Sequence, residues 1–147
     1  MIEQKKVYSL SIILKRIKEY LEVKVKDKKF WIKAEISNIN FHRSGHCYID
    51  LVETKDSQIL AQCKASIWSY NLNNIKLDLG TDFQNILKKG SEILLLVEIN
   101  FSEIYGLGIT IYSVDKSFSI GELEKKKEET LFKLKNENLL TLNKEKK

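Results

Sequence analysis

Residues 34–51, with the sequence AEISNINFHRSGHCYIDL, constrain the fold more than any other segment. Hydrophobic and polar residues alternate on both sides of a polar loop that contains Gly45. Alternation with a period of two is typical of a strand with one buried face, and a short glycine-containing loop between two such runs indicates a hairpin. The segment therefore predicts a strand-loop-strand unit of the kind that begins a small β-barrel.

The rest of the chain extends this pattern. Leu10, Ile13, Leu14, Ile17 and Leu21 are spaced as on one face of a helix, and Ser9 is placed to cap it. Alternation predicts strands at 30–39, 46–53, 59–68, 93–101 and 107–114, with a helical and irregular insertion at 69–89. Five strands in this order fit an oligonucleotide-binding (OB) barrel, although the pattern alone also allows other small barrels.

A second helix is expected after the last strand. Ser119 and Glu122 form an S-x-x-E capping box, and Phe118 can pack on Leu123 as a hydrophobic staple. The helix is predicted to run to about Asn138, with an apolar stripe that Lys127 interrupts; its members are Ile120, Leu123, Leu131 and Leu134. We therefore expect an OB domain at residues 1–118, followed at 119–147 by a connector helix and a frayed tail.

Charge is unevenly distributed along the chain. The net charge is +5, but residues 1–33 carry 10 Lys and Arg against 4 acidic residues, whereas residues 34–118 carry 7 against 10. An attractive field for phosphate must then come mainly from the N-terminal helix and the first strand. No apolar run approaches the roughly 20 residues that span a bilayer. Cys47 and Cys63 are isolated thiols without metal-binding or disulfide spacing, so a cytoplasmic location is expected.

The strand alternation sorts side chains between two faces. The predicted inner face is small or aliphatic: Ile32, Ala34, Ile36, Cys47, Ile49, Leu51, Ile59, Ala61, Cys63, Ala65 and Ile67. The outer face of the first three strands combines aromatic and polar or cationic groups: Trp31, Lys33, His46, Tyr48, Gln62, Lys64 and Trp68. Aromatic rings stack with unpaired bases and cations neutralise phosphates, so this face predicts binding of a single strand of nucleic acid. Either Trp could instead pack beneath a helix.

The loop between the first two strands adds candidate contacts. It places Phe41, His42 and Arg43 beside the outer face, where they are predicted to clamp a phosphate and a base. An ordinary hairpin loop is the alternative.

No metal centre, cofactor or catalytic residue is expected. Strand alternation sends His46 and Cys47 to opposite faces, so they cannot join His42 in a zinc site. Asp50, Glu53 and Asp56 are spread along a strand and its turn and are not paired across a cleft.

The chain also resembles a known family. The similarity lies in YSLSIILKRIKEYLE, AEISNINFHRSGHCYIDL, CKASIWSYNL and the long segment from VEINF to NENLL, and it points to the N-terminal OB domain of the large subunit of exonuclease VII. The resemblance implies a domain that holds single-stranded DNA for a hydrolase. In that family the hydrolytic residues lie in a later segment and the small subunit is recruited through the C-terminal part, so this chain alone is expected to be non-catalytic and to stop near the start of that later segment. A protein-docking or dimerisation module is the alternative function.

Overall fold

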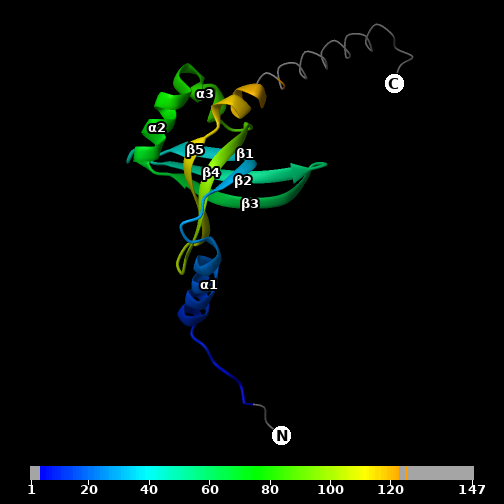
Figure 1. Ribbon diagram of the computed structural model, residues 1–147. Coiled ribbons are helices and arrows are strands. Elements are labelled where there is room, and N and C mark those ends of the chain that lie inside the picture. Colours follow the sequence, from blue (N-terminus) through cyan, green and yellow to red (C-terminus); the bar gives the residue numbers. More distant parts are fainter. Residues whose placement is uncertain (1–3, 123–124, 126–147) are drawn as a thin grey trace, which may run out of the picture.

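Five strands form a closed barrel in the computed structural model of the protein, which describes residues 4–122 and 125. The strands are β1 (Phe30–Phe41), β2 (Cys47–Lys55), β3 (Gln58–Ile67), β4 (Glu92–Ser102) and β5 (Gly106–Val114). Around the barrel they follow the order β1-β2-β3-β5-β4 (Figure 1). This topology confirms the predicted five-stranded OB barrel.

β1 pairs with two neighbours along different parts of its length. Its first half, from Phe30 to Glu35, pairs with β4, and its second half, from Glu35 to Phe41, pairs with β2. A register shift between Ile36 and Asn38 marks a bulge, which bends a strand and increases its twist. Because of this bend, one strand belongs to both sides of the barrel, and its two halves face different surroundings.

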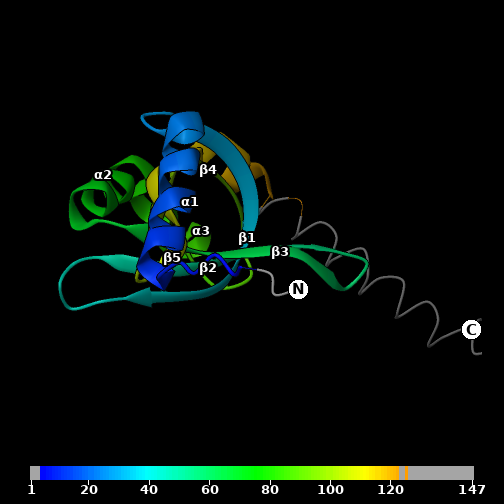
Figure 2. The same cartoon turned by 90° about the horizontal axis from the view of Figure 1, so that it is seen from below.

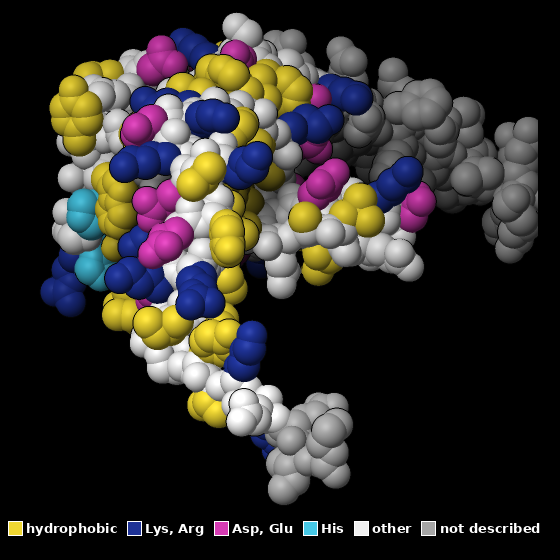
Figure 3. Space-filling view, turned by 60° about the horizontal axis from the view of Figure 1, so that its bottom comes forward, with side chains coloured by type: hydrophobic (Ala, Val, Ile, Leu, Met, Phe, Trp, Pro, Cys, Tyr) yellow, Lys and Arg dark blue, Asp and Glu magenta, His cyan; other side chains and the backbone are white. Residues whose placement is uncertain are grey.

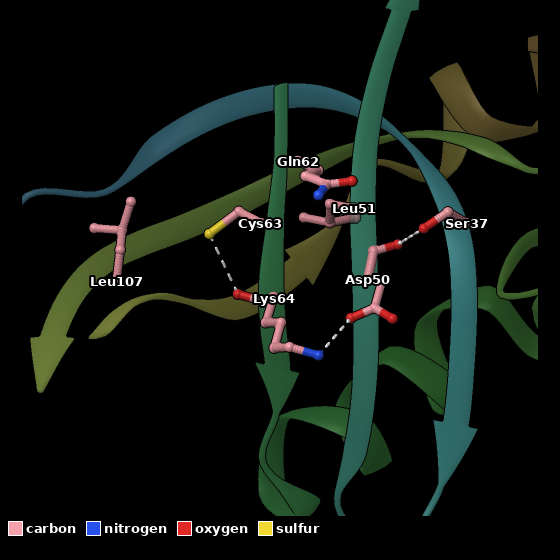
Figure 4. A pocket seen from close by; sticks show the side chains of 7 residues that line it. All are labelled: Ser37, Asp50, Leu51, Gln62, Cys63, Lys64 and Leu107. Carbon is pink, nitrogen blue, oxygen red and sulfur yellow. Dashed lines mark hydrogen bonds and ion pairs between the residues drawn. The ribbon is translucent and has the colours of Figure 1, made fainter. Parts of the chain in front are cut away.

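The barrel closes through a short parallel contact between β3 and β5. Two residue pairs make this contact, Ala65 with Ile109 and Ser66 with Thr110. Beyond it the strands separate, and a hollow of about 410 Å³ opens beside Gln62, Cys63 and Leu107 (Figure 4). The closure therefore leaves an indentation in the surface of the barrel.

Aliphatic side chains from all five strands form one core. Its fully buried members include Ile36, Ile49, Ile67, Ile93, Leu95 and Ile111. Helices α2 (Ser69–Leu79) and α3 (Phe83–Ile86), joined by the 3-10 turn η1 (Gly80–Asp82), lie together at one end of the barrel (Figure 1). They bury Leu72, Ile75, Leu79 and Ile86 against the core. The helical insertion predicted between the third and fourth strands is confirmed.

The N-terminal helix α1 (Leu10–Val25) lies beside β4, toward the other end of the barrel (Figures 1 and 2). As predicted, Ser9 caps it: the Ile12 backbone N–H donates to Oγ of Ser9 at 3.3 Å. Lys18 forms an ion pair of 3.4 Å with Glu103 in the β4–β5 loop. No residue of α1 is buried within the described part of the chain. The helix is thus attached to the barrel at its surface and contributes nothing to the core.

The hairpin of β2 and β3 differs from the sequence prediction. Ile59 and Ala61 were expected on the inner face, but both are exposed. The register shifts at Glu53 and Thr54, and the hairpin extends past the barrel, on the side opposite the β1–β2 loop (Figure 2). Alternation indicates which residues share a face of a strand. Where a strand extends beyond its neighbours, no other element packs on that face, and its residues stay exposed.

The start of the C-terminal helix also requires a correction. The helix begins at residue 116, and the Phe118 backbone N–H donates to the side chain of Asp115 at 2.7 Å. Asp115 is therefore the N-cap, and the predicted capping box of Ser119 and Glu122 is wrong. Ser119 is 2% exposed, one turn inside the helix, and its hydroxyl has no hydrogen-bond partner among the described residues. The expected continuation to Asn138, with Leu123, Lys127, Leu131 and Leu134, lies outside the described residues.

Replacing the two candidate cap residues should affect the free energy of unfolding differently. Asp115→Ala removes the acceptor for a free helix amide and should lower the free energy of unfolding by about 1 kcal/mol. Ser119→Ala should leave it unchanged or raise it slightly, because it removes a buried hydroxyl that has no partner among residues 4–122 and 125. Urea unfolding of both variants against the parent measures the difference. A larger loss for Ser119→Ala than for Asp115→Ala would restore the capping box.

Candidate nucleic-acid interface

Four rings gather where β2, the β1–β2 loop and the start of α2 meet. Tyr48 projects outward from β2 because its neighbours Cys47 and Ile49 point into the core. Its ring centroid lies 6.0 Å from that of His42 and 6.4 Å from that of Trp68, and the Trp68 and His46 centroids are 5.0 Å apart. We call His42, His46, Tyr48 and Trp68 the ring cluster.

The ring cluster is packed edge to face. Its interplanar angles lie between 77° and 87°, an arrangement that aromatic pairs favour over a face-to-face sandwich. Tyr48 remains 39% exposed and Trp68 43% exposed. Each of these two rings is therefore held by its neighbours and is still open to solvent. A nucleobase could stack on a ring of this kind without displacing core residues.

His46 connects the ring cluster to α2. The Ser69 backbone N–H, the first amide of α2, donates to Nδ1 of His46 at 2.9 Å. Nδ1 therefore acts as an acceptor, and His46 is half-buried. Trp68 precedes this amide and contributes no side-chain cap. The imidazole replaces the missing cap of α2 and supports the Trp68 ring, so its role here is to position Trp68.

The β1–β2 loop is fixed by its own hydrogen bonds. The Ser44 backbone N–H donates to Nδ1 of His42 at 3.1 Å, and the Gly45 backbone N–H donates to the His42 carbonyl at 3.0 Å. Gly45 has a φ of +92°, and a Cβ on it would lie 3.3 Å from Cβ of Ser69. Glycine thus provides both the left-handed turn and the close approach of the loop to α2.

The other two residues predicted in this loop, Phe41 and Arg43, have different surroundings. The Phe41 ring lies 5.9 Å from the ring of Phe83 in α3, so it packs toward the helical insertion. Arg43 is exposed, and no ion pair involves it among the described residues. Only Arg43 is thus available here as a cation for a phosphate.

Lys64 projects from β3 beside the ring cluster but is already paired. Its Nζ lies 3.5 Å from a carboxylate oxygen of Asp50 on β2 (Figure 4). The Lys64 side chain is largely exposed, and a surface ion pair of this kind contributes little free energy. A phosphate could therefore compete with Asp50 for Lys64. Gln62 is exposed on the same strand and lines the hollow between β3 and β5.

Trp31 and Lys33 lie elsewhere. They belong to the first half of β1, opposite Leu96 and Leu94 of β4. Lys33 forms an ion pair of 3.5 Å with Glu92, and a separate indentation there also contains Glu35 and Glu53. Trp31 is 53% exposed, so neither Trp is packed away beneath a helix. The predicted outer face is thus divided, because β1 bends between its two halves.

The larger part of the surface depression was not predicted. A groove of about 600 Å³ runs from Tyr48, Lys64 and Trp68 across the closure of the barrel to β4, β5 and their connecting loop. Asn100, Ser102, Tyr105, Leu107 and Thr110 line this far side. Tyr105 could have been suspected from the sequence, because it is an aromatic residue in the short loop SEIYG. The signal was missed because only the closed barrel brings that loop opposite β3.

Charges of both signs are interspersed on the face of the molecule that Figure 3 shows. Figure 3 shows Lys and Arg side chains alternating with Asp and Glu, and hydrophobic side chains between them. At the groove itself the cation Lys64 is matched by Asp50. The two charged residues that line the groove, Lys64 and Asp50, therefore offset each other, and aromatic rings lie beside them.

Three further features concern the reactivity of the thiols, metal binding and membrane spans among the described residues. Burial raises the pKa of the Cys47 thiol to about 11, against a smaller lowering by Lys76, and burial also raises the pKa of Cys63. At neutral pH both sulfurs are thus protonated and poorly nucleophilic. Within the same residues, no cluster of His, Cys, Asp and Glu could hold a metal ion, and no helix is long and apolar enough to cross a membrane.

Comparison with known proteins agrees with this architecture. The exodeoxyribonuclease 7 large subunit of Fusobacterium nucleatum is 29% identical over 130 residues, which confirms the resemblance found in the sequence. The match covers 88% of this chain and 29% of the relative, so the chain spans less than a third of that protein's length. Residues 8–115 match the family described as the OB-fold nucleic acid binding domain. With a closed five-stranded barrel and a family match over most of its length, the chain belongs to the OB-fold nucleic-acid-binding domains.

Proposed function

We propose that this domain binds single-stranded DNA in the groove between the ring cluster and the β4–β5 loop. The observation that carries the proposal is the pair of half-exposed rings, Tyr48 and Trp68, at one end of a groove that crosses β3 and β5. OB barrels bind oligonucleotides on the face of their second and third strands and on the adjoining loops. Stacking on an aromatic ring requires an unpaired base, which a duplex does not offer.

The charge distribution favours modest affinity. Stacking contributes about 1–3 kcal/mol per base, and few cations lie at the groove to add phosphate contacts. Arg43 at the β1–β2 loop and Lys64 on β3 are the two we assign to phosphates. Lys33 is held by Glu92, outside the groove, and we leave it out of the site. An affinity near micromolar follows, with salt dependence set by these few contacts.

The biological setting is proposed from the relative. An exodeoxyribonuclease large subunit is much longer than this chain, and we propose that the domain presents single-stranded DNA to a catalytic segment of such a protein. A small subunit would then be contacted by other parts of that protein. For its location we propose the cytoplasm, where unpaired thiols such as Cys47 and Cys63 stay reduced.

The ring cluster should determine affinity for a single strand. Tyr48→Ala should weaken binding of a fluorescein-labelled oligothymidine by about fivefold or more, because it removes one stacking surface. Tyr70→Ala is the matched control, since Tyr70 is an exposed tyrosine on α2 and does not line the groove. Fluorescence anisotropy at fixed salt measures both, with thermal unfolding as a check on folding. Equal affinities for the two variants would remove Tyr48 from the site.

Unlabelled duplex of the same length should compete poorly in this assay. If duplex competes as well as the single strand, the groove does not select unpaired bases and the proposal fails. If no DNA binds and the protein instead assembles with increasing concentration, a docking or dimerisation module replaces it. The exposed apolar residues of α1, such as Leu10 and Val23, would then be the first surface to test.

Lys64 should contribute one phosphate contact. Lys64→Ala should reduce the slope of log K against log salt by about 0.7, the value expected for one phosphate of a single strand. Asp50→Asn should strengthen binding, because it removes the carboxylate that competes with phosphate for the ammonium group. Lys33→Ala is the control: this lysine has a similar ion pair outside the groove and should leave the slope unchanged. A slope that falls with Lys33→Ala and not with Lys64→Ala would place the DNA on the first half of β1.

A further inference from the structure

A polar pair occupies the far side of the groove, opposite the ring cluster. Asn100 on β4 and Thr110 on β5 both line it, and Nδ2 of Asn100 donates to Oγ1 of Thr110 at 2.8 Å. Thr110 is 6% exposed, whereas Asn100 is exposed. The buried hydroxyl thus holds one hydrogen of the amide. Within the described part of the chain, no other hydrogen bond engages the Asn100 amide, so its oxygen and second N–H remain for a ligand.

The backbone beside this pair leaves room for the amide. Gly108 lies directly across from Asn100 in the β4–β5 ladder. A Cβ on Gly108 would lie 2.8 Å from Oδ1 of Asn100, closer than two such atoms can approach. The φ of Gly108 is outside the left-handed region, so its backbone does not require glycine. The absence of a side chain at residue 108 therefore allows the Asn100 amide to occupy its observed position.

We propose that Asn100 reads the Watson–Crick edge of an unpaired base in the groove, with Thr110 and Gly108 as positioning residues. The inference rests on the proposed binding of single-stranded DNA. An amide that offers one acceptor and one donor complements an adjacent donor and acceptor on a base. Tyr105 and Leu107 line the same part of the groove and provide apolar surface beside the base. The groove then combines stacking at one end with hydrogen bonding at the other.

Thymine is the most suitable base for a test. Its Watson–Crick edge presents the acceptor O4, the donor N3–H and the acceptor O2 in sequence. The amide of Asn100 can therefore pair with N3–H and either O4 or O2, whichever way the amide is oriented. Methylation at N3 removes the central donor and retains the ring that stacks. The comparison of oligothymidine with its N3-methylthymine counterpart therefore isolates the hydrogen bonds of the edge.

The experiment measures the affinity of both oligonucleotides for the parent and for three variants. The parent should bind oligothymidine at least about fivefold more tightly than the methylated strand, the low end of what a bidentate amide–base pair contributes. Asn100→Ala and Gly108→Ala should bring the ratio close to one, with little change for the methylated strand. Asn74→Ala, which alters an exposed asparagine on α2, should keep the parental ratio. Thermal unfolding checks that each variant is folded.

The outcomes separate the two proposals. A parent that binds both strands equally overturns the role of Asn100 and leaves single-strand binding by stacking intact. A parental ratio that persists in folded Asn100→Ala shows that another group reads the base, which also overturns it. A parent that binds neither strand overturns the inference together with the proposed function.

Discussion

The rest of the structure depends on the parallel contact of Ala65 and Ser66 with Ile109 and Thr110. Without it β3 and β5 would both be sheet edges, and the core residues Ile67 and Ile111 would lose the strand that covers them. The contact is short, so it encloses the core at Ala65 and Ser66 and lets the two strands diverge at Cys63 and Leu107. The hollow beside Cys63 and Leu107 lies where the strands diverge. The groove crosses the closure itself, since Ala65, Ser66, Ile109 and Thr110 all line it.

The two sides of the groove differ in chemistry because they come from different parts of the chain. One side is built from the β1–β2 loop, β2 and the end of β3, and it presents rings. The other side is built from β4, β5 and their loop, and it presents the amide and hydroxyl of Asn100 and Thr110 together with Tyr105. Charge contributes less than either side, because Lys64 faces a carboxylate at 3.5 Å. A ligand with flat faces and polar edges matches this arrangement better than a polyanion alone.

Local pattern was sufficient to predict the strands, and long-range pairing accounts for what it missed. Period-two alternation indicated the five strands and placed Tyr48 and Lys64 on the outer face. The same alternation grouped Trp31 and Lys33 with them, because a linear pattern does not show the bulge at Ile36 and Asn38. Asn100 and Tyr105 were overlooked because they reach β3 only through barrel closure. At the C-terminal helix, Asp115 and Ser119 are both good caps by residue type, and only the backbone course decides between them.

Two contacts attach the β1–β2 loop to the first turn of α2: the imidazole of His46 on the Ser69 amide and the close approach of Gly45 to the Ser69 side chain. The ring of Trp68 lies 5.0 Å from that of His46, and the ring of Tyr48 lies 6.4 Å from that of Trp68. These contacts orient the two rings in the unbound domain, so under the proposed function they would lose little rotamer entropy when a base stacks on them. The helical insertion thus helps to orient these rings through the contacts of its first turn with the β1–β2 loop.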